Sequence, residues 1–250
     1  MIDLQEQIAL VTGGSRGIGR AAALLLARAG AHVALTYHTR ADEAEVTARE
    51  IRSLGRRTYV AGGDLANPDV AERLVAGVKR EFGGLDILVA NAGVWPAEEV
   101  SLASMPVERW RGTVAANLDS VFFSTRAALR LMRPGGRIVI VSSTAGQRGE
   151  PFHSDYAATK GALISLTKSL AVECAPAILV NCVAPGWVDT EMSLPAFTQD
   201  NRDRIERTIP LRRIATAEDI AGPILFLCSE LARHVSGEVL NVNGGSVLCG

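Results

Sequence analysis

Tyr156 and Lys160 are the two residues whose types and spacing most directly suggest catalysis. Residues four apart on a helix share one face, so the phenol and the ammonium would be neighbours. A free tyrosine titrates near pH ~10, and a nearby lysine cation stabilises the phenolate and lowers the pKa of the phenol. The chain has only three lysines among 26 cationic residues, and one of them stands here. The spacing predicts an acid–base catalyst, although it also fits a solvated helix face.

A second candidate site lies near the N-terminus, where an apolar run precedes a glycine-rich turn. Residues 8–11 predict a buried strand, and residues 20–29 carry a helical pattern. Between them lies Thr-Gly-Gly-Ser-Arg-Gly-Ile-Gly, residues 12–19. A further strand at 31–36 follows at the distance that completes a βαβ unit. An ordinary turn is the alternative, but this order of elements is typical of dinucleotide binding.

Three glycines of this turn have separate expected roles. Gly13 permits the tight turn, Gly17 lets the backbone approach a pyrophosphate, and Gly19 lets the helix pack closely against the strand. The N-terminus of the helix can then hold the anion.

The elements that must position these residues alternate between strands and helices along the whole chain. Besides the two strands above, five more are predicted, at 58–61, 87–90, 137–142, 179–184 and 239–242. Continuous apolar strands are typical of a parallel sheet covered on both faces, and ligands bind at the carboxyl ends of such strands. The sequence predicts an α/β protein: one Rossmann domain over residues 1–250, with a doubly wound parallel sheet of about seven strands.

Composition supports one large domain and excludes several classes of protein. The chain has 250 residues, 48% of them apolar, and no linker divides it. A net charge of −1 argues against nucleic acid as a partner. No apolar stretch reaches the ~18 residues of a membrane span and the acidic start lacks the features of a signal peptide, so a cytoplasmic protein is expected. The four cysteines show no metal-binding spacing, and no metal site is expected.

Taken together, the motifs resemble the classical short-chain dehydrogenases/reductases. The matching motifs are the glycine turn at 12–19, Asn91-Ala92-Gly93, Ser143, Tyr156-x-x-x-Lys160 and Pro185-Gly186. The resemblance continues through residues 217–220 and 236–245, and the pattern is most similar to the 3-oxoacyl carrier-protein reductases. It implies an NADP-dependent oxidoreductase that moves a hydride between the cofactor and a carbonyl or secondary alcohol.

The resemblance also implies a catalytic set. Ser143 would hydrogen-bond the substrate oxygen while Tyr156 transfers the proton, and Lys160 would bind the nicotinamide ribose. Ser142 competes with Ser143 for this role, or both serines satisfy backbone groups. Asn117 would keep a water in contact with Lys160 for proton relay; a solvent-facing asparagine is the alternative.

Cofactor contacts are expected from the carboxyl ends of the strands. They involve Gly13, Ser15, Arg16, Gly17, Ile18, Gly19, His38, Arg40, Asp64, Leu65, Asn91, Ala92, Gly93, Tyr156, Lys160, Pro185, Gly186, Val188 and Thr190. The resemblance places Asp64 at the adenine amino group, although a helix N-cap is an alternative. Residues 185–190 would cup the nicotinamide, unless they form a simple turn.

Charge favours NADP over NAD. An acidic residue at the end of the second strand would bind a ribose 2′-hydroxyl, whereas this chain has Tyr-His-Thr-Arg at 37–40 and Arg16 in the glycine turn. Arginine pairs well with phosphate, so a 2′-phosphate is expected there.

The sequence is less informative about the substrate-binding end of the site. Trp95, Phe152, His153, Trp187, Met192 and Phe197 lie beside the motifs, where they would line the site or simply pack. The segment 189–213 is expected to form a charged lid. Pro134 and Ala177 stand where carrier-protein reductases would offer cations, which argues against a carrier substrate. A sugar, polyol or steroid-like alcohol is the alternative substrate, and a non-catalytic nucleotide-binding regulator is the alternative function.

The resemblance further implies a homotetramer, in which the helical segments 110–131 and 156–174 pair across a two-fold axis.

Overall fold

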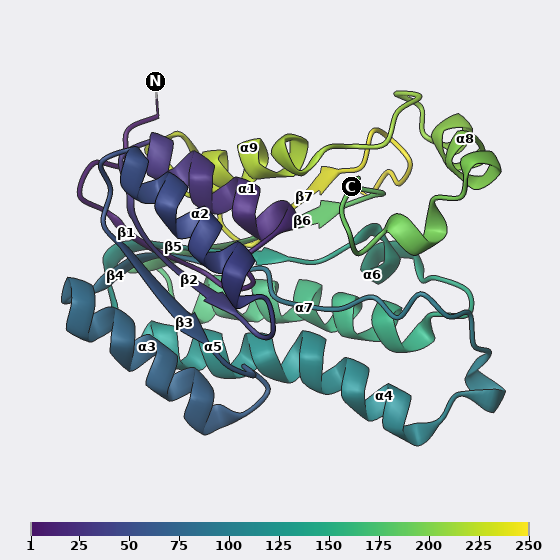
Figure 1. Cartoon of the computed structure of the whole chain (residues 1–250), viewed down its shortest axis with the longest axis horizontal. Helices are drawn as coiled ribbons and strands as arrows, with labels where there is room; N and C mark the ends of the chain where they lie inside the picture. The colour runs from purple at the N-terminus through teal and green to yellow at the C-terminus, as the bar shows by residue number, and fades with distance from the viewer. Residues whose placement is uncertain (1, 250) are drawn as a thin grey trace.

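Seven strands pair in parallel to form one sheet, in the order β3-β2-β1-β4-β5-β6-β7. The computed structural model describes residues 2–249, and Figure 1 shows the sheet between two layers of helices. The strands are β1 (Ile8–Val11), β2 (His32–Tyr37), β3 (Thr58–Gly62), β4 (Leu85–Ala90), β5 (Met132–Val141), β6 (Ile178–Pro185) and β7 (Val239–Val242). The predicted seven-stranded Rossmann fold is confirmed.

Strands β4, β5 and β6 begin earlier than the sequence predicts, and the difference is largest for β5. β5 starts at Met132 and not at Arg137. The sequence did not predict this first part because residues 133–135 are exposed and carry none of the apolar pattern of a buried strand. The pairing with β4 shifts register across this stretch, between Leu85 and Ile87.

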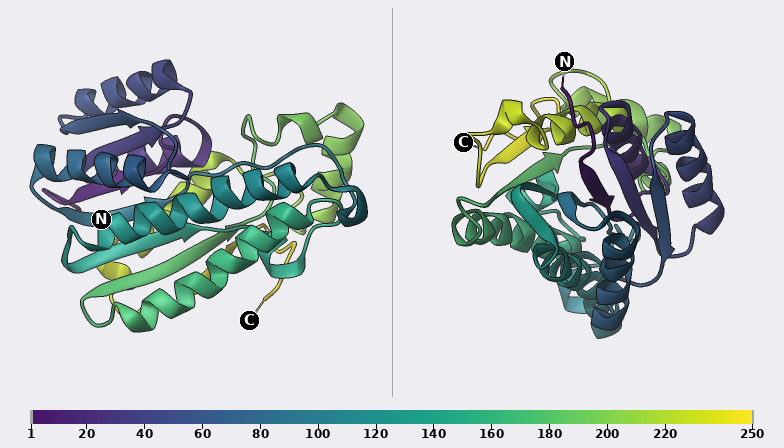
Figure 2. Two further views of the ribbon diagram at one scale, coloured as in Figure 1. Left: turned by 90° about the horizontal axis from the view of Figure 1, so that it is seen from below. Right: turned by 90° about the vertical axis from the view of Figure 1, so that its left-hand side faces the viewer.

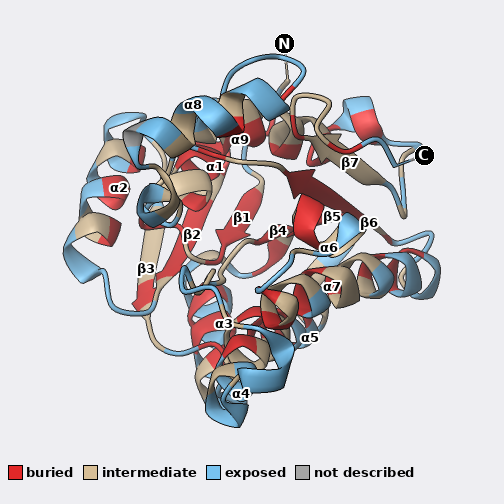
Figure 3. Ribbon diagram, turned by 90° about the vertical axis from the view of Figure 1, so that its right-hand side faces the viewer, coloured by how far each residue is buried: buried red, intermediate tan, exposed pale blue. Residues whose placement is uncertain are grey.

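The central strands are apolar on both faces because helices cover both. In β1, Ala9 and Val11 face one core while Ile8 and Leu10 face the other, as the two-residue period of a strand requires. Helices α1 (Gly17–Arg28), α2 (Ala41–Ser53) and α9 (Ala217–Leu227) cover the first face. Helices α3 (Pro68–Phe82), α4 (Val107–Val114), α5 (Ser120–Leu129) and α7 (Ser154–Glu173) cover the second, and Figures 2 and 3 show both layers.

Helices α4 and α5 are joined by η2 (Ala115–Asp119), a π-helical turn that contains the buried Asn117. A π turn inside an α-helix is frequently found at a functional site.

The segment 189–213 follows the end of β6 and packs into a small apolar cluster with its flanking residues. It contains η3 (Leu194–Ala196) and α8 (Gln199–Thr208). Ile205, Ile209 and Ile214 are buried together, with Trp187 and Phe197 packed against them. The remaining short elements are η1 (Leu102–Ser104), α6 (Thr144–Arg148) and η4 (Glu230–Ala232). Within residues 2–249, no helix combines the length and apolarity needed to cross a membrane.

The chain leaves β1 and β4 towards opposite sides of the sheet, since β1 is followed by β2 on one side and β4 by β5 on the other. A crevice opens outside the carboxyl ends of strands at such a switch point. The glycine turn, Asn91 and Ser143 follow β1, β4 and β5 at this edge.

Candidate active site

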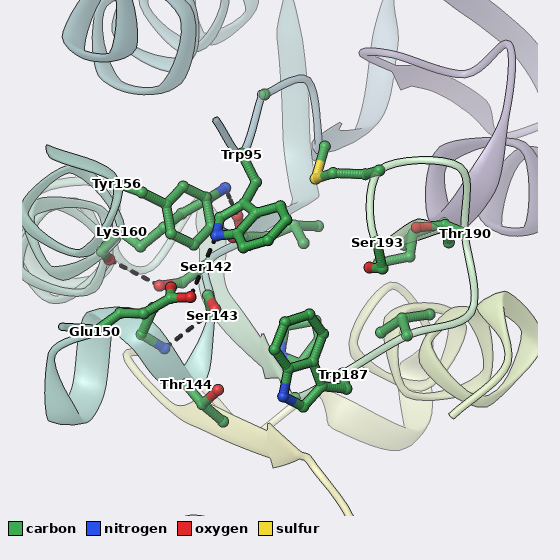
Figure 4. A pocket seen from close by; sticks show the side chains of 18 of the residues that line it. Trp95, Ser142, Ser143, Thr144, Glu150, Tyr156, Lys160, Trp187, Thr190 and Ser193 are labelled. Carbon is green, nitrogen blue, oxygen red and sulfur yellow. Dashed lines mark hydrogen bonds between the residues drawn. The ribbon is translucent and has the colours of Figure 1, made fainter. Parts of the chain in front are cut away.

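Helix α7 brings Tyr156 and Lys160 to the carboxyl end of β5. The Lys160 ammonium donates a hydrogen bond to the Val141 carbonyl oxygen at 2.9 Å and lies 5.7 Å from the centroid of the Tyr156 ring. Lys160 is buried, and both residues line the same cavity (Figure 4). The two side chains are neighbours, as their spacing predicts.

The pKa values of these two groups correct one expectation. Burial raises the pKa of Tyr156 to about 12, with a smaller increase from the charge of Glu150, while a hydrogen bond with Ser143 acts in the opposite direction. Burial also lowers the pKa of Lys160 to about 8. The expectation that Lys160 lowers the pKa of Tyr156 is therefore wrong for this arrangement: both groups lose hydration, and the ammonium hydrogen-bonds Val141.

Ser142 and Ser143 both line the cavity at the end of β5, but their hydroxyl groups make different hydrogen bonds. The buried Ser142 hydroxyl donates to the Lys160 carbonyl oxygen at 2.7 Å. Ser143 lies in the cavity, where its hydroxyl oxygen accepts a hydrogen bond from the Ala145 amide at 3.1 Å and caps α6 (Figure 4). The Ser142 hydroxyl therefore satisfies a backbone carbonyl, which favours Ser143 as the serine that contacts a ligand.

Asn117 is fully buried, so the solvent-facing alternative is wrong. Its side-chain oxygen accepts from the Val94 amide at 2.7 Å, and its side-chain nitrogen donates to the Val94 carbonyl at 3.0 Å. A Cβ atom added to Gly93 would lie 2.8 Å from Asn117 Oδ1 and 3.5 Å from Lys160 Nζ. Asn117 and Lys160 thus converge on Gly93, although Asn117 itself does not line the cavity.

The glycine turn has the shape of an anion cradle. Gly17 has a φ of +52°, which favours glycine, and a Cβ at Gly19 would lie 2.2 Å from the Gly13 carbonyl oxygen. The first turn of α1 has neither a side-chain cap nor an acidic residue. Its amide groups and the helix dipole therefore suit a negatively charged ligand.

Asn91 ties the end of β4 to this turn. Its side-chain nitrogen donates to the carbonyl oxygens of Thr12 and Gly13, at 3.0 and 3.3 Å. The bonds hold the glycine turn against the central strand, where Asn91 also lines the cavity.

The cavity has two lobes that share lining residues, so a long ligand could span them. The lobe at the glycine turn is lined by Gly13, Ser15, Arg16, Gly17, Ile18, His38, Arg40, Asp64, Leu65, Asn91, Ala92, Gly93 and Thr190. The other, here called the substrate lobe, is lined by Ile18, Asn91, Gly93, Ser143, Tyr156, Lys160, Pro185, Gly186, Val188 and Thr190. Of the predicted site residues, Gly19 and Asn117 line neither lobe. The uncapped helix, the glycine turn and the connected lobes fit a dinucleotide.

Asp64 does not cap a helix. Its carboxylate accepts from the Ala66 amide at 2.9 Å, whereas Asn67 caps α3 by accepting from the amides of Asp69 and Val70. The N-cap alternative for Asp64 is therefore wrong.

The six residues expected at the substrate end divide into two groups. Trp95, Trp187 and Met192 line the cavity. Phe152, His153 and Phe197 do not: Phe152 is exposed, His153 is buried with its ring stacked 4.9 Å from that of Trp95, and Phe197 packs on Trp187 at 5.6 Å.

Glu150 is a cavity residue that the sequence reasoning missed. Its carboxylate accepts a hydrogen bond from the Trp95 indole at 3.2 Å and lies 3.8 Å from His153 Nδ1. Burial raises the pKa of this carboxyl above its ordinary value. Figure 4 shows it beside Ser143 and Tyr156, with Trp187 across the cavity. A signal was present, because Glu150 and Asp155 are the acidic residues between Ser143 and Tyr156.

Glu191 was missed as well, and it lies between the two arginines expected to bind phosphate. Its Oε2 atom pairs with Arg16 and lies 3.8 Å from Arg40 Nη2. Arg40 also contacts Glu43, at 3.2 Å. Nothing in the local sequence around Glu191 indicates this contact, since its partners stand about 150 or more residues earlier. Among residues 2–249, no cluster of His, Cys, Asp and Glu is placed to hold a metal.

Known proteins resemble the chain over nearly its whole length. The family described as enoyl-(acyl carrier protein) reductase matches residues 13–246. An L-rhamnose 1-dehydrogenase (NAD(P)(+)) of Azotobacter vinelandii is 39% identical, with 97% of each chain covered. A 3-oxoacyl-[acyl-carrier-protein] reductase of Synechocystis is 36% identical, covering 99% of this chain and 100% of the relative.

Two solved structures also resemble the chain over nearly its whole length. A short-chain dehydrogenase of Burkholderia cenocepacia in complex with NADP superposes with a TM-score of 0.92 and 39% identity, covering 97% of this chain and 98% of that one. A Brucella melitensis short-chain dehydrogenase/reductase superposes with a TM-score of 0.93 and 35% identity, over 99% of both chains. The chain belongs to the short-chain dehydrogenase/reductase family of NAD(P)-dependent oxidoreductases.

Proposed function

We propose that the chain is an NADPH-preferring reductase of carbonyl compounds, which also oxidises the corresponding secondary alcohols. The observation that carries the proposal is the convergence of Tyr156, Ser143 and Lys160 on a cavity continuous with the glycine turn. NADPH bound there would supply the hydride. A regulator without turnover has no need of these three side chains together.

Bound cofactor would lie along the carboxyl edge of the sheet. The first amides of α1 would hold the pyrophosphate, Asp64 and Leu65 the adenine, and residues 185–190 the nicotinamide. Lys160 would hold the nicotinamide ribose.

The protein's own part of the reaction is proton transfer. With a pKa of about 12, the Tyr156 phenol is protonated at neutral pH and can donate its proton to a carbonyl oxygen. Ser143 would donate a hydrogen bond to the same oxygen. Asn117 would hold a water that returns a proton to Tyr156 through Lys160.

The preference for NADPH is supported by charge. Arg16 and Arg40 line the lobe at the glycine turn, and residues 37–39 at the end of β2 contain no acid that would bind a ribose 2′-hydroxyl. The Burkholderia relative is named as an NADP complex, and the Azotobacter relative as using NAD(P)(+).

A sugar or polyol dehydrogenase is a second candidate, favoured by Glu150. A carboxylate accepts hydrogen bonds from hydroxyl groups, and Trp95 and Trp187 offer apolar faces beside it. A substrate with a hydroxyl next to the reacting carbon would use these groups, and the Azotobacter relative is named for L-rhamnose.

A carrier-bound 3-oxoacyl substrate has less support. Pro134 and Ala177 lie together at the amino edge of the sheet, where the Gly135 amide donates to the Ala177 carbonyl oxygen at 2.8 Å. Ser143 lies at the other end of β5, roughly 30 Å away at about 3.3 Å per residue. This edge offers an acidic carrier no cation at Pro134 or Ala177.

We further propose a cytoplasmic homotetramer, with the segment 189–213 as a lid. Trp110 and Phe122 on α4 and α5 and Val172 on α7 are exposed apolar residues on the helices expected to pair between subunits. The lid proposal is supported by Thr190 and Met192, which line both lobes. Light scattering that shows a monomer at micromolar concentration would refute the tetramer.

The decisive experiment is a panel of ketones, small thioesters, sugars and polyols, followed by the absorbance of reduced nicotinamide with NADPH and NADH. Turnover that depends on Tyr156 supports an oxidoreductase of this mechanism. Cofactor binding without turnover of any substrate would favour the regulator, and faster turnover with NADH would remove the NADPH preference.

A further inference from the structure

The site expected to bind the cofactor 2′-phosphate already contains a carboxylate from the protein. Glu191 Oε2 pairs with Arg16 and lies 3.8 Å from Arg40, and all three residues line the lobe at the glycine turn. Glu43 neutralises Arg40 further. Two cations and two carboxylates leave this corner without net charge, so it attracts a phosphate less than its arginines alone would.

The exposure of these groups indicates that the contact can be exchanged. The side chains of Arg16, Arg40 and Glu191 are 43%, 49% and 50% exposed. Ion pairs between such exposed groups are weak. A phosphate monoester carries about −1.5 to −2 charges and three acceptor oxygens, so it is the stronger partner for two guanidinium groups.

Glu191 also belongs to the segment that bounds the substrate lobe. The preceding residue, Thr190, lies against the glycine turn, so that a Cβ at Gly17 would be 3.3 Å from Thr190 Cγ2. The following residues, Met192 and Ser193, line the substrate lobe (Figure 4). Displacement of Glu191 would therefore act at the entrance to that lobe.

We propose that Glu191 is a residue that determines cofactor specificity, by competing with the 2′-phosphate of NADP for Arg16 and Arg40. With NAD, which lacks this phosphate, the contact between Glu191 and Arg16 is kept and fastens the segment 189–213 to the glycine turn. With NADP, the phosphate takes both arginines and repels the carboxylate. Glu191 thus narrows the difference in affinity between the two cofactors. This inference rests on the proposed binding of the 2′-phosphate at Arg16 and Arg40.

The test is the dissociation constant of NADPH and of NADH, measured by titration with the purified chain. Glu191→Gln should tighten NADPH binding roughly fivefold, the scale of one exposed ion pair, and leave NADH binding equal or weaker. Glu206→Gln is the matched control. It makes the same substitution in the same segment, but Glu206 pairs with Arg202 at 3.5 Å and not with the cofactor arginines. It should leave the ratio of the two constants unchanged.

A double-mutant cycle separates competition from a general effect of charge. In an Arg16→Ala background, Glu191→Gln should lose most of its effect on NADPH, because the competing pair is already broken. An equal change for both cofactors, an unchanged NADPH constant, or an equal effect of Glu206→Gln would overturn the inference. The wild-type constants alone test the NADPH preference, so either proposal can fail while the other stands.

Discussion

Replacing Lys160 with methionine should change how the stability of the protein depends on pH. Lys160 is buried, and burial lowers its pKa to about 8 from an ordinary value of 10.5. Between these two pH values, the unfolded chain binds a proton that the folded chain does not. Stability therefore rises with pH through this window, and the cost of the buried charge is present in full below pH 8.

The difference between the two pKa values gives the magnitude. At 1.36 kcal/mol for each pH unit, the full effect is about 3 kcal/mol, and most of it, about 2.5 kcal/mol, is gained between pH 7 and pH 10. In the variant this contribution is absent. Methionine also leaves the Val141 carbonyl without its hydrogen bond, which costs about 1–3 kcal/mol at every pH.

The assay is denaturant unfolding of wild type and variant at several pH values from 7 to 10. The difference in the free energy of unfolding should shift by about 2.5 kcal/mol in favour of the wild type as pH rises. Titrating groups that do not interact with Lys160 cancel in this difference. Lys168→Met is the control, because Lys168 is exposed on the same helix. Curves for wild type and Lys160→Met that remain parallel would refute the argument from burial.

Four further results are expected. Tyr156→Phe should lower kcat by roughly 10³-fold and leave the Kd of NADPH nearly unchanged, as single-turnover kinetics and titration would show; retained turnover would contradict the mechanism. Arg16→Ala combined with Arg40→Ala should raise the KM for NADPH at least about tenfold relative to that for NADH, because charge-assisted contacts to phosphate are lost; equal changes would move the phosphate site elsewhere. Glu150→Gln should raise the KM for a polyhydroxylated substrate roughly tenfold without changing that for a simple ketone, and the wild-type KM should rise as pH falls towards the raised pKa of Glu150. Free ketones and small thioesters should be reduced as efficiently as carrier-bound acyl groups, with little dependence on salt; a carrier preference that disappears in high salt would restore the carrier substrate.

Local pattern was enough to predict the fold and the position of the site. Strands β1 and β4 are buried on both faces, so each is a continuous apolar run that can be read without knowing its neighbours. The spacing of Tyr156 and Lys160 likewise depends only on the geometry of one helix. Parallel strands then bring the residues at their carboxyl ends to one edge, which is why Ser143, Asn91 and the glycine turn meet.

Properties that depend on how deeply a side chain is buried could not be predicted from local pattern. The spacing of Tyr156 and Lys160 indicates proximity but not the loss of water around both groups, and it is burial that moves the pKa of Tyr156 upward. The burial of Asn117 depends on its place in the π-helical turn and on the backbone of Val94, which packs beside it from another part of the chain. For Asn117, the deciding contact comes from a segment 23 residues earlier in the chain.

Glu191 shows why the charge of a binding site cannot be counted from its motif alone. The arginines at 16 and 40 are predicted to attract phosphate, and both line the lobe at the glycine turn, yet the attraction they exert depends on the carboxylates that fold against them. Glu43 is close in sequence to Arg40, whereas Glu191 arrives only because β6 ends at the same edge as β1 and directs the following segment over the glycine turn. The topology that builds the cofactor site therefore also delivers the residue that competes for it.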